Sequence, residues 1–221
     1  MLSTEEAGVS ARWVRGVGLA GAVVMVGVLS GGTAQAAPPP APGILVSDGI
    51  TKCSTGFAAQ GNDGGYYLFT SGHCDHGAPF TYDENVPLGH ITASEVLGDL
   101  KDAAIIRLDP DIGAPPGDVG GQRVRGVLSA SQVKAGMPFC KFGAMTGETC
   151  GAVNSLDGEV VEAHVFAQPG DSGGPGYVKN GDGTVTAVGL VMSTSLAGDP
   201  NTTYFVLVQP LLGRWGVHVV A

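Results

Sequence analysis

The sequence predicts an all-β protein, and three observations lead to that prediction. The chain of 221 residues contains 37 glycines but only 6% aromatic residues, a balance typical of a protein with many turns. Hydrophobic residues make up 43% and charged residues 14%, which suits a packed globular core rather than a disordered chain. From Ile44 onward, short apolar runs alternate with turn clusters. This spacing is typical of a β-sandwich or β-barrel.

The apolar runs define the expected strands. They cover residues 55–59, 66–70, 90–96, 103–108, 124–128, 152–154, 160–166, 184–192 and 204–208. The turn sequence Asn-Gly-Asp-Gly at residues 180–183 predicts a tight hairpin between two such runs. Residues 211–215 predict one short C-terminal helix, which Gly213 weakens.

The folded part of the chain divides into two halves. Residues 109–118 are rich in proline, glycine and aspartate, which is the composition of a linker. The sequence therefore predicts an N-terminal β domain over residues 44–118 and a C-terminal β domain over residues 119–221.

The N-terminal segment has the features of an export signal. Arg12 and Arg15 precede an apolar stretch over residues 16–29, and residues 33–37 (TAQAA) have the small-residue form of a cleavage site. The alternative is a membrane anchor, but the uncharged run is shorter than the ~20 residues that a spanning helix needs. We therefore expect a signal peptide over residues 1–36, a proline-rich leader over residues 37–43, and a secreted protein without a stable membrane anchor.

The charge balance and the motifs exclude several classes of partner. The net charge is −9, and no cluster of lysine and arginine is present that could neutralise phosphates. We therefore expect no nucleic-acid partner. The sequence contains no nucleotide-binding loop that we recognise, so we expect no cofactor, and we expect a monomer.

Export changes how the four cysteines are interpreted, because thiols outside the cytoplasm are oxidised. Proximity in sequence suggests disulfides between Cys53 and Cys74 and between Cys140 and Cys150. A zinc site is the alternative, yet neither pair has the Cys-x2-Cys spacing or a second knuckle beside it. The sequence therefore predicts two disulfides and no metal.

One serine stands in an unusual run, Pro-Gly-Asp-Ser-Gly-Gly-Pro, at residues 169–175. Glycines allow a backbone to turn tightly and let another group approach its N–H groups. A serine hydroxyl is a weak nucleophile, so acyl-transfer chemistry also needs an imidazole base and a carboxylate that orients it. Ser172 is therefore a candidate nucleophile only if the chain supplies both.

A histidine and an aspartate fit these two roles. His73 follows an apolar strand and precedes Cys74, whose disulfide would fix its position. Asp102 opens the apolar run 103–108, where a carboxylate would be shielded from water. Asp99 is expected to be an exposed turn residue. The other histidines are expected to be surface or core residues: His76, His90, His164 and His218.

At this point the chain resembles the chymotrypsin-like serine proteases, and among them the bacterial streptogrisin and α-lytic type. The resemblance covers nearly all of residues 44–221 and rests on residues 70–74, 102–108, 140–151, 169–175, 202–205 and 214–217. It implies two orthogonal antiparallel six-stranded β-barrels, with the site in the cleft between them.

The resemblance also assigns roles to the matching positions. Ser172 would be the nucleophile, His73 the general base and then the general acid, and Asp102 the residue that orients His73. The N–H groups of Gly170 and Ser172 would form the oxyanion hole. Within the bacterial subgroup, a basic side chain just after the first cysteine of the loop that corresponds to Cys140–Cys150 binds the aspartate next to the nucleophile. That correspondence predicts a buried ion pair between Lys141 and Asp171.

The sequence departs from the family pattern in places that affect specificity and activity. There is no room for a long folding pro-region before Ile44, and a third disulfide near the nucleophile is absent. Residues 189–195 resemble the substrate-binding edge strand, where the family usually has a serine that supports the catalytic aspartate and then glycine. Met192 or Ser193 takes the first position here, and Thr194 or Ser195 would narrow the pocket. The substrate-binding residues are expected to be Phe166, Ala167, Met192, Ser193 and Thr194.

Three functions are compatible with these features. The first is a secreted serine endopeptidase that cleaves peptide or protein substrates through an acyl-enzyme. The others are an esterase with the same triad and a binding module that kept the fold but lost catalysis, for which the altered edge strand is the argument. Because Phe166, rather than an aspartate, stands six positions before Ser172, we expect cleavage after a small or medium apolar residue rather than after lysine or arginine.

Overall fold

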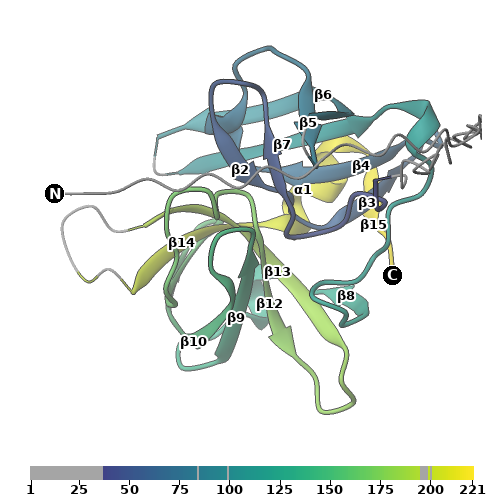
Figure 1. Cartoon of the computed structure of the whole chain (residues 1–221). Coiled ribbons are helices and arrows are strands. Elements are labelled where there is room, and N and C mark those ends of the chain that lie inside the picture. The colour runs from purple at the N-terminus through teal and green to yellow at the C-terminus, as the bar shows by residue number, and fades with distance from the viewer. Residues whose placement is uncertain (1–36, 84, 99, 195–198, 200) are drawn as a thin grey trace, which may run out of the picture. The chain divides into compact units, whose positions relative to one another are not determined.

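Strands form most of the regular structure in the computed structural model of this chain. It describes residues 37–221 except 84, 99, 195–198 and 200. The described strands belong to two sheets, and one α-helix lies near the C-terminus (Figure 1). The predicted signal peptide at residues 1–36 and the predicted turn residue Asp99 lie outside the described residues. The all-β prediction is confirmed.

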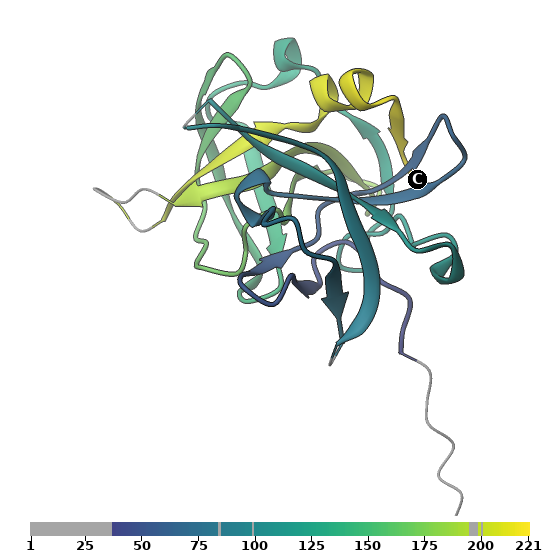
Figure 2. The same ribbon diagram turned by 90° about the horizontal axis from the view of Figure 1, so that it is seen from above.

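The first sheet has eight strands in the order β15-β3-β4-β7-β6-β5-β1-β2. Their bounds are β1 Leu45–Ser47, β2 Lys52–Ser54, β3 Ala58–Gly61, β4 Tyr66–Thr70, β5 Phe80–Tyr82, β6 Val86–Leu97, β7 Lys101–Leu108 and β15 Val217–Val219. All the pairings are antiparallel. The last strand of the chain, β15, lies at the edge of this sheet beside β3 (Figure 2). The first half is therefore extended by a strand from the far end of the sequence.

The second sheet has seven strands in the order β12-β9-β10-β11-β14-β13-β8, and an additional pairing joins β12 to β13. This pairing closes six antiparallel strands into the expected barrel. The bounds are β8 Val124–Val127, β9 Pro138–Gly143, β10 Gly147–Asp157, β11 Val160–His164, β12 Pro175–Lys179, β13 Val185–Thr194 and β14 Thr202–Leu207. Strand β8 stays outside the closed barrel and pairs parallel with β13. Helix α1, Val208–Trp215, follows β14 and includes the predicted helix at residues 211–215.

Some of the expected runs form strands over their whole length, and others do so only in part. The hairpin predicted at residues 180–183 joins β12 to β13, where Lys179 pairs with Val185. The run at residues 55–59 is only partly a strand, because Thr55 is hydrogen-bonded to Gly43 and Ile44 and β3 begins at Ala58. Short strands such as β1, β2 and β5 were missed because three residues are too few for periodicity to be recognised.

Three clusters of buried side chains form the core. One lies within the first sheet and includes Val46, Leu68, Phe80, Leu88 and Ile106. A second fills the closed barrel and includes Phe139, Val153, Val161 and Phe205. The third contains side chains from both halves, among them Phe57, Phe69, Ile105, Tyr177, Leu190, Val206 and Leu211. The shared cluster fixes one half against the other, which is a requirement for a site built from both.

Strand β7 shows why its run of apolar residues is continuous rather than alternating. Ile105 points into the shared cluster, whereas its neighbour Ile106 points into the cluster of the first sheet. A strand that is buried on both faces needs apolar residues at successive positions. Asp102 lies near the start of this strand, so its carboxylate is held by a rigid element.

The proline-rich segment at residues 37–43 contains no helix or strand but is packed on the first half. Pro40 and Pro42 are buried. The Gly43 N–H donates to the Thr55 carbonyl at 2.8 Å, and the Thr55 hydroxyl donates to the Ala41 carbonyl at 2.6 Å. Among the described residues, no helix is long and apolar enough to cross a membrane.

Candidate active site

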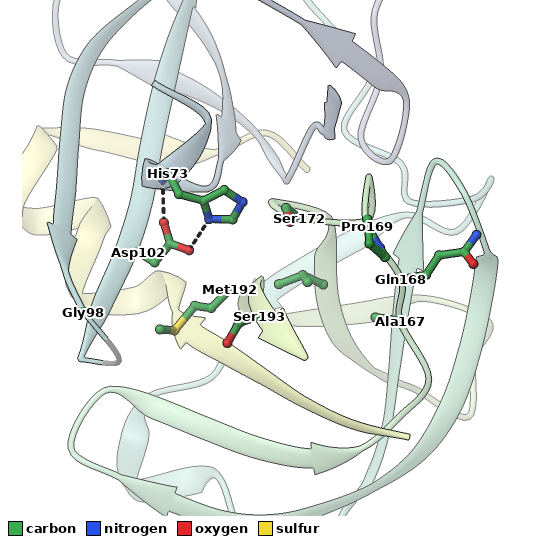
Figure 3. A pocket seen from close by; sticks show the side chains of 10 residues that line it. His73, Gly98, Asp102, Ala167, Gln168, Pro169, Ser172, Met192 and Ser193 are labelled. Carbon is green, nitrogen blue, oxygen red and sulfur yellow. Dashed lines mark hydrogen bonds and ion pairs between the residues drawn. The ribbon is translucent and has the colours of Figure 1, made fainter. Parts of the chain in front are cut away.

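The base candidate His73 lies at a sharp turn after β4. The short 3-10 helix Gly72–Cys74 carries it, and the Cys53–Cys74 disulfide ties that turn to β2. The His73 N–H donates to Asp102 Oδ1 at 2.7 Å, and His73 Nδ1 lies 2.6 Å from Asp102 Oδ2 (Figure 3). The Asp102 side chain is 8% exposed, whereas that of His73 is 42% exposed. The carboxylate therefore fixes both the backbone and the ring of a histidine that reaches solvent.

The orientation of the His73 ring has a chemical consequence. Because a carboxylate only accepts hydrogen bonds, Nδ1 must carry the proton that it shares with Asp102. The other nitrogen, Nε2, is then unprotonated in the neutral ring and can accept a proton from a nearby hydroxyl.

Ser172 lies on a tight loop that is held against β13. The Gly173 N–H donates to the Val191 carbonyl at 2.8 Å, and the Val191 N–H donates to the Gly174 carbonyl at 2.9 Å. Gly173 has a φ of +86°, and a Cβ there would lie 2.5 Å from both the Ser54 carbonyl oxygen and the Thr70 hydroxyl. Only glycine fits this position, which explains the glycine that directly follows Ser172.

His73, Asp102 and Ser172 line one cavity of about 300 Å³ (Figure 3). The cavity brings together β7, the turn after β4 and the loop between β11 and β12. Among the hydrogen bonds of the described residues, none joins His73 to Ser172. Such bonds are often long before a substrate is bound.

Lys141 and Asp171 form a fully buried ion pair behind the Ser172 loop. Lys141 Nζ lies 3.1 Å from Asp171 Oδ2, and neither side chain is exposed. Burial opposes ionisation of Asp171, but hydrogen bonds from Thr146 and the Lys141 charge outweigh it, so the pKa of Asp171 lies below its usual value. Burial lowers the pKa of Lys141, and Asp171 counteracts part of that effect.

Backbone amides also bind Asp171. Its Oδ1 accepts the N–H groups of Met145 and Thr146 at 3.0 and 3.2 Å, and its Oδ2 accepts the Gln168 N–H at 3.1 Å. These contacts fix the residue that precedes Ser172. The N–H groups of Gly170 and Ser172 have no acceptor among the hydrogen bonds of the described residues, so they are free to donate to a ligand.

Comparison with solved structures shows which proteins have a similar fold. The crystal structure of Nocardiopsis protease aligns with a TM-score of 0.66 and 26% identity, over 82% of this chain and 99% of that chain. The chain is similar in structure to bacterial chymotrypsin-like serine proteases. An α-lytic protease homologue, N4, aligns with a TM-score of 0.64 and 29% identity, over 80% of this chain and 97% of that chain. The trypsin-like double-barrel fold class implied by the resemblance is thereby confirmed. Only the second sheet is a closed six-stranded barrel; the first has eight strands with no closing pairing among the described residues and forms a half-barrel.

Sequence comparison gives weaker matches. Uncharacterized proteins of two Mycobacterium tuberculosis strains, CDC 1551 and H37Rv, are 34% and 33% identical over 57% of this chain. The chain spans 62% of the length of these curated relatives. Streptogrisin-C of Streptomyces griseus is 28% identical over 78% of this chain and 39% of its own length. No known family model matches the sequence.

The expected edge strand, β13, is irregular at Met192. The pairing of β13 with β14 shifts register between Val191 and Ser193, so Met192 is the extra residue of a β-bulge. Its side chain is 3% exposed, belongs to the shared core cluster and lines the cavity with Asp102 (Figure 3). Met192 is therefore the buried residue of this part of the cavity lining, whereas Ser193 is exposed.

The expected substrate-binding residues are distributed unevenly around the cavity. Ala167, Met192 and Ser193 line it. Phe166 is 41% exposed and is not among the lining residues. Thr194 pairs through its backbone with Thr203, and its side chain lies outside the described part of the structure. The sequence interpretation did not name four further lining residues as substrate-binding: Gly98, Gln168, Pro169 and Val191.

The four cysteines form the two disulfides expected from their proximity, Cys53–Cys74 and Cys140–Cys150. The sulfurs of Cys53 and Cys74 lie within 4.8 Å of a His73 ring nitrogen, a spacing that could suit a metal. Because a metal ligand must be a free thiolate, the disulfide removes both sulfurs from such a site.

Proposed function

We propose that the protein is a secreted serine endopeptidase that hydrolyses peptide bonds with Ser172, His73 and Asp102. The observation that carries the proposal is the bond of 2.6 Å between His73 Nδ1 and the nearly buried Asp102, at a cavity that Ser172 also lines. Serine proteases among the fold relatives support hydrolase chemistry.

In the first step, His73 Nε2 takes the proton of the Ser172 hydroxyl as its oxygen forms a bond to the substrate carbonyl carbon. Asp102 stabilises the positive charge that develops on the ring. The oxygen of the tetrahedral intermediate becomes negative and accepts hydrogen bonds from the N–H groups of Gly170 and Ser172. The intermediate then expels the amine, which receives the proton from His73, and the acyl group stays on Ser172.

In the second step a water molecule replaces the amine. His73 removes one proton from this water as its oxygen attacks the acyl carbon. The second tetrahedral intermediate releases Ser172, which recovers its proton from His73, and the free carboxylic acid leaves. The substrate is thus cleaved into an amine and an acid with one water consumed.

The lining of the cavity favours an apolar residue before the scissile bond. Ala167, Val191 and Met192 are buried apolar lining residues. A basic substrate side chain would need a carboxylate at the base of its pocket, as in trypsin. Asp102 is the one carboxylate among the residues that line the described cavity, and His73 occupies both its oxygens.

Two disulfides support secretion, because such bonds persist in oxidising compartments. A non-catalytic binding module is the competing function, and the apolar Met192 in the cavity that Asp102 also lines is the observation in its favour. Reactivity separates the two, since only an activated serine reacts with a fluorophosphonate probe.

The decisive experiment treats the protein from Ala37 to Ala221 with a fluorophosphonate probe at neutral pH and locates the adduct by mass spectrometry. We expect one adduct, on Ser172, that is absent from Ser172→Ala and at least about 1,000-fold slower in Asp102→Asn. Absence of labelling in a folded protein with both disulfides intact would overturn the proposal. Turnover of peptide against ester substrates then separates the endopeptidase from an esterase.

A further inference from the structure

Ser54 lies directly behind the Ser172 loop, although it belongs to the other half of the molecule. It is the last residue of β2 and is fully buried. Its hydroxyl donates to the Gly170 carbonyl at 2.7 Å and accepts the Ala144 N–H at 2.9 Å. Its own N–H donates to the Ser172 carbonyl at 2.7 Å. One residue of the first sheet thus binds the carbonyls of both residues whose N–H groups are the oxyanion donors in the proposed function.

The backbone conformation of Gly170 depends on such an external contact, because a residue without a side chain does not restrict its own φ and ψ angles. Its φ is +98°, in a region that glycine enters and leaves easily. The direction of its N–H therefore depends on the groups that hold the neighbouring peptide units. Asp171 is held by Lys141 and by three backbone amides, but the described hydrogen bond to the Gly170 carbonyl comes from Ser54.

Ser54 is itself held rigidly. Cys53 is joined to Cys74, and Ser54 pairs with Leu45 of β1. The Thr70 hydroxyl donates to the Ser54 carbonyl at 3.0 Å. The Ser54 hydroxyl donates one hydrogen bond and accepts another. If it rotated away, the Gly170 carbonyl or the Ala144 N–H would lose its partner, which is unfavourable.

We propose that Ser54 is a positioning residue whose hydroxyl fixes the Gly170 carbonyl and thereby aims the Gly170 and Ser172 N–H groups at the oxyanion. The proposal rests on the proposed serine protease chemistry. It predicts a specific defect: loss of the hydroxyl slows formation of the bond to Ser172, because the donors are misaligned, while the binding of a ligand in the cavity is little changed.

Saturation kinetics with a fluorophosphonate probe separates the rate of bond formation to Ser172 from the binding of the probe. The phosphoryl oxygen of the probe takes the place of the oxyanion. We expect Ser54→Ala to reduce the maximal rate of Ser172 labelling about 10- to 100-fold while the probe concentration at half-maximal rate changes less than about threefold. Ser54→Thr, which retains the hydroxyl, should recover most of the rate.

The matched control is Ser47→Ala. The Ser47 hydroxyl donates to the Thr51 carbonyl at 2.7 Å, in the turn between β1 and β2, and makes no described contact with the Ser172 loop. We expect unchanged labelling in this variant. If Ser54→Ala does not fold, Ser54→Gly also removes the hydroxyl and is measured in the same way.

The outcomes are distinguishable from failure of the proposed function. Wild-type protein that is not labelled refutes the serine protease mechanism and the role of Ser54 with it. Wild-type protein that is labelled, with a folded Ser54→Ala or Ser54→Gly labelled at the same maximal rate, refutes the positioning role alone. An equal loss in Ser47→Ala would also refute it, because the effect would then be general destabilisation.

Discussion

Lys141 Nζ lies 3.1 Å from Asp171 Oδ2, and both side chains are fully buried beside the candidate nucleophile. Removing one member of a buried pair leaves an uncompensated charge, which costs about 3 to 5 kcal/mol. We therefore expect Lys141→Met to lower the free energy of unfolding by that amount and to slow labelling of Ser172. Denaturant unfolding and the probe reaction measure the two effects.

Lys179→Met is the control for this variant. Lys179 pairs with Glu148 at 2.5 Å, but both side chains are partly exposed, so the loss should be below about 1 kcal/mol. Equal effects of the two substitutions would show that burial of the Lys141 pair contributes nothing to the active-site loop.

Asp48 should make the protein sensitive to acid. Burial opposes its ionisation, but hydrogen bonds from the Thr51 and Ile50 N–H groups and from His76 prevail and hold the pKa of Asp48 below its usual value. A carboxylate whose pKa is lower in the folded state contributes stability above its unfolded pKa near 4 and loses it as pH falls further. Asp48→Asn should therefore cost about 1 to 2 kcal/mol at pH 7 and progressively less below pH ~4.

Unfolding curves at a series of pH values measure this difference. Asp118→Asn is the control, because Asp118 is exposed and makes no hydrogen bond among the described residues. A wild-type minus Asp48→Asn difference that stays constant between pH 6 and about pH 2 would contradict the prediction.

Gly173 should tolerate no side chain. A Cβ there would lie 2.5 Å from the Ser54 carbonyl and 2.7 Å from the Ser71 N, and its φ of +86° is unfavourable for other residues. We expect Gly173→Ala to cost about 3 kcal/mol or more and to abolish labelling of Ser172. Gly121→Ala has a similar φ of +79° but open space around it, so it should cost only about 1 kcal/mol. Thermal unfolding of both variants tests this, and similar losses would mean that φ alone, not the close approach, restricts residue 173.

Met192 should limit catalysis because it offers Asp102 no hydrogen bond. Met192→Ser and Met192→Ala both remove a buried side chain, and each should cost about 2 to 4 kcal/mol of stability. The serine also supplies a donor beside Asp102, which should make labelling of Ser172 about tenfold faster than in the alanine variant. Equal labelling rates in the two variants would mean that the aspartate needs no further support.

The sequence was informative where a physical requirement is local. The strand at residues 66–70 and the hairpin at residues 180–183 follow from apolar runs and turn residues. The glycines around Ser172 and the candidates His73 and Asp102 were named because nucleophilic chemistry needs those residue types. Ser54 was missed, since a serine after a cysteine carries no such signal until the fold places its hydroxyl against Gly170.

The sequence by itself determined the β class, the two disulfides and the residue types of the candidate site, because turn chemistry, oxidation and nucleophile activation each constrain composition or spacing. Only the tertiary structure decided that Met192 is buried and Ser193 exposed, since Met192 is the extra residue of a β-bulge. It also decided that Ser54 contacts Gly170 and that β15 pairs with β3. These contacts join residues that are far apart in the chain. Which residues meet depends on the three-dimensional packing, and a local sequence pattern does not predict it.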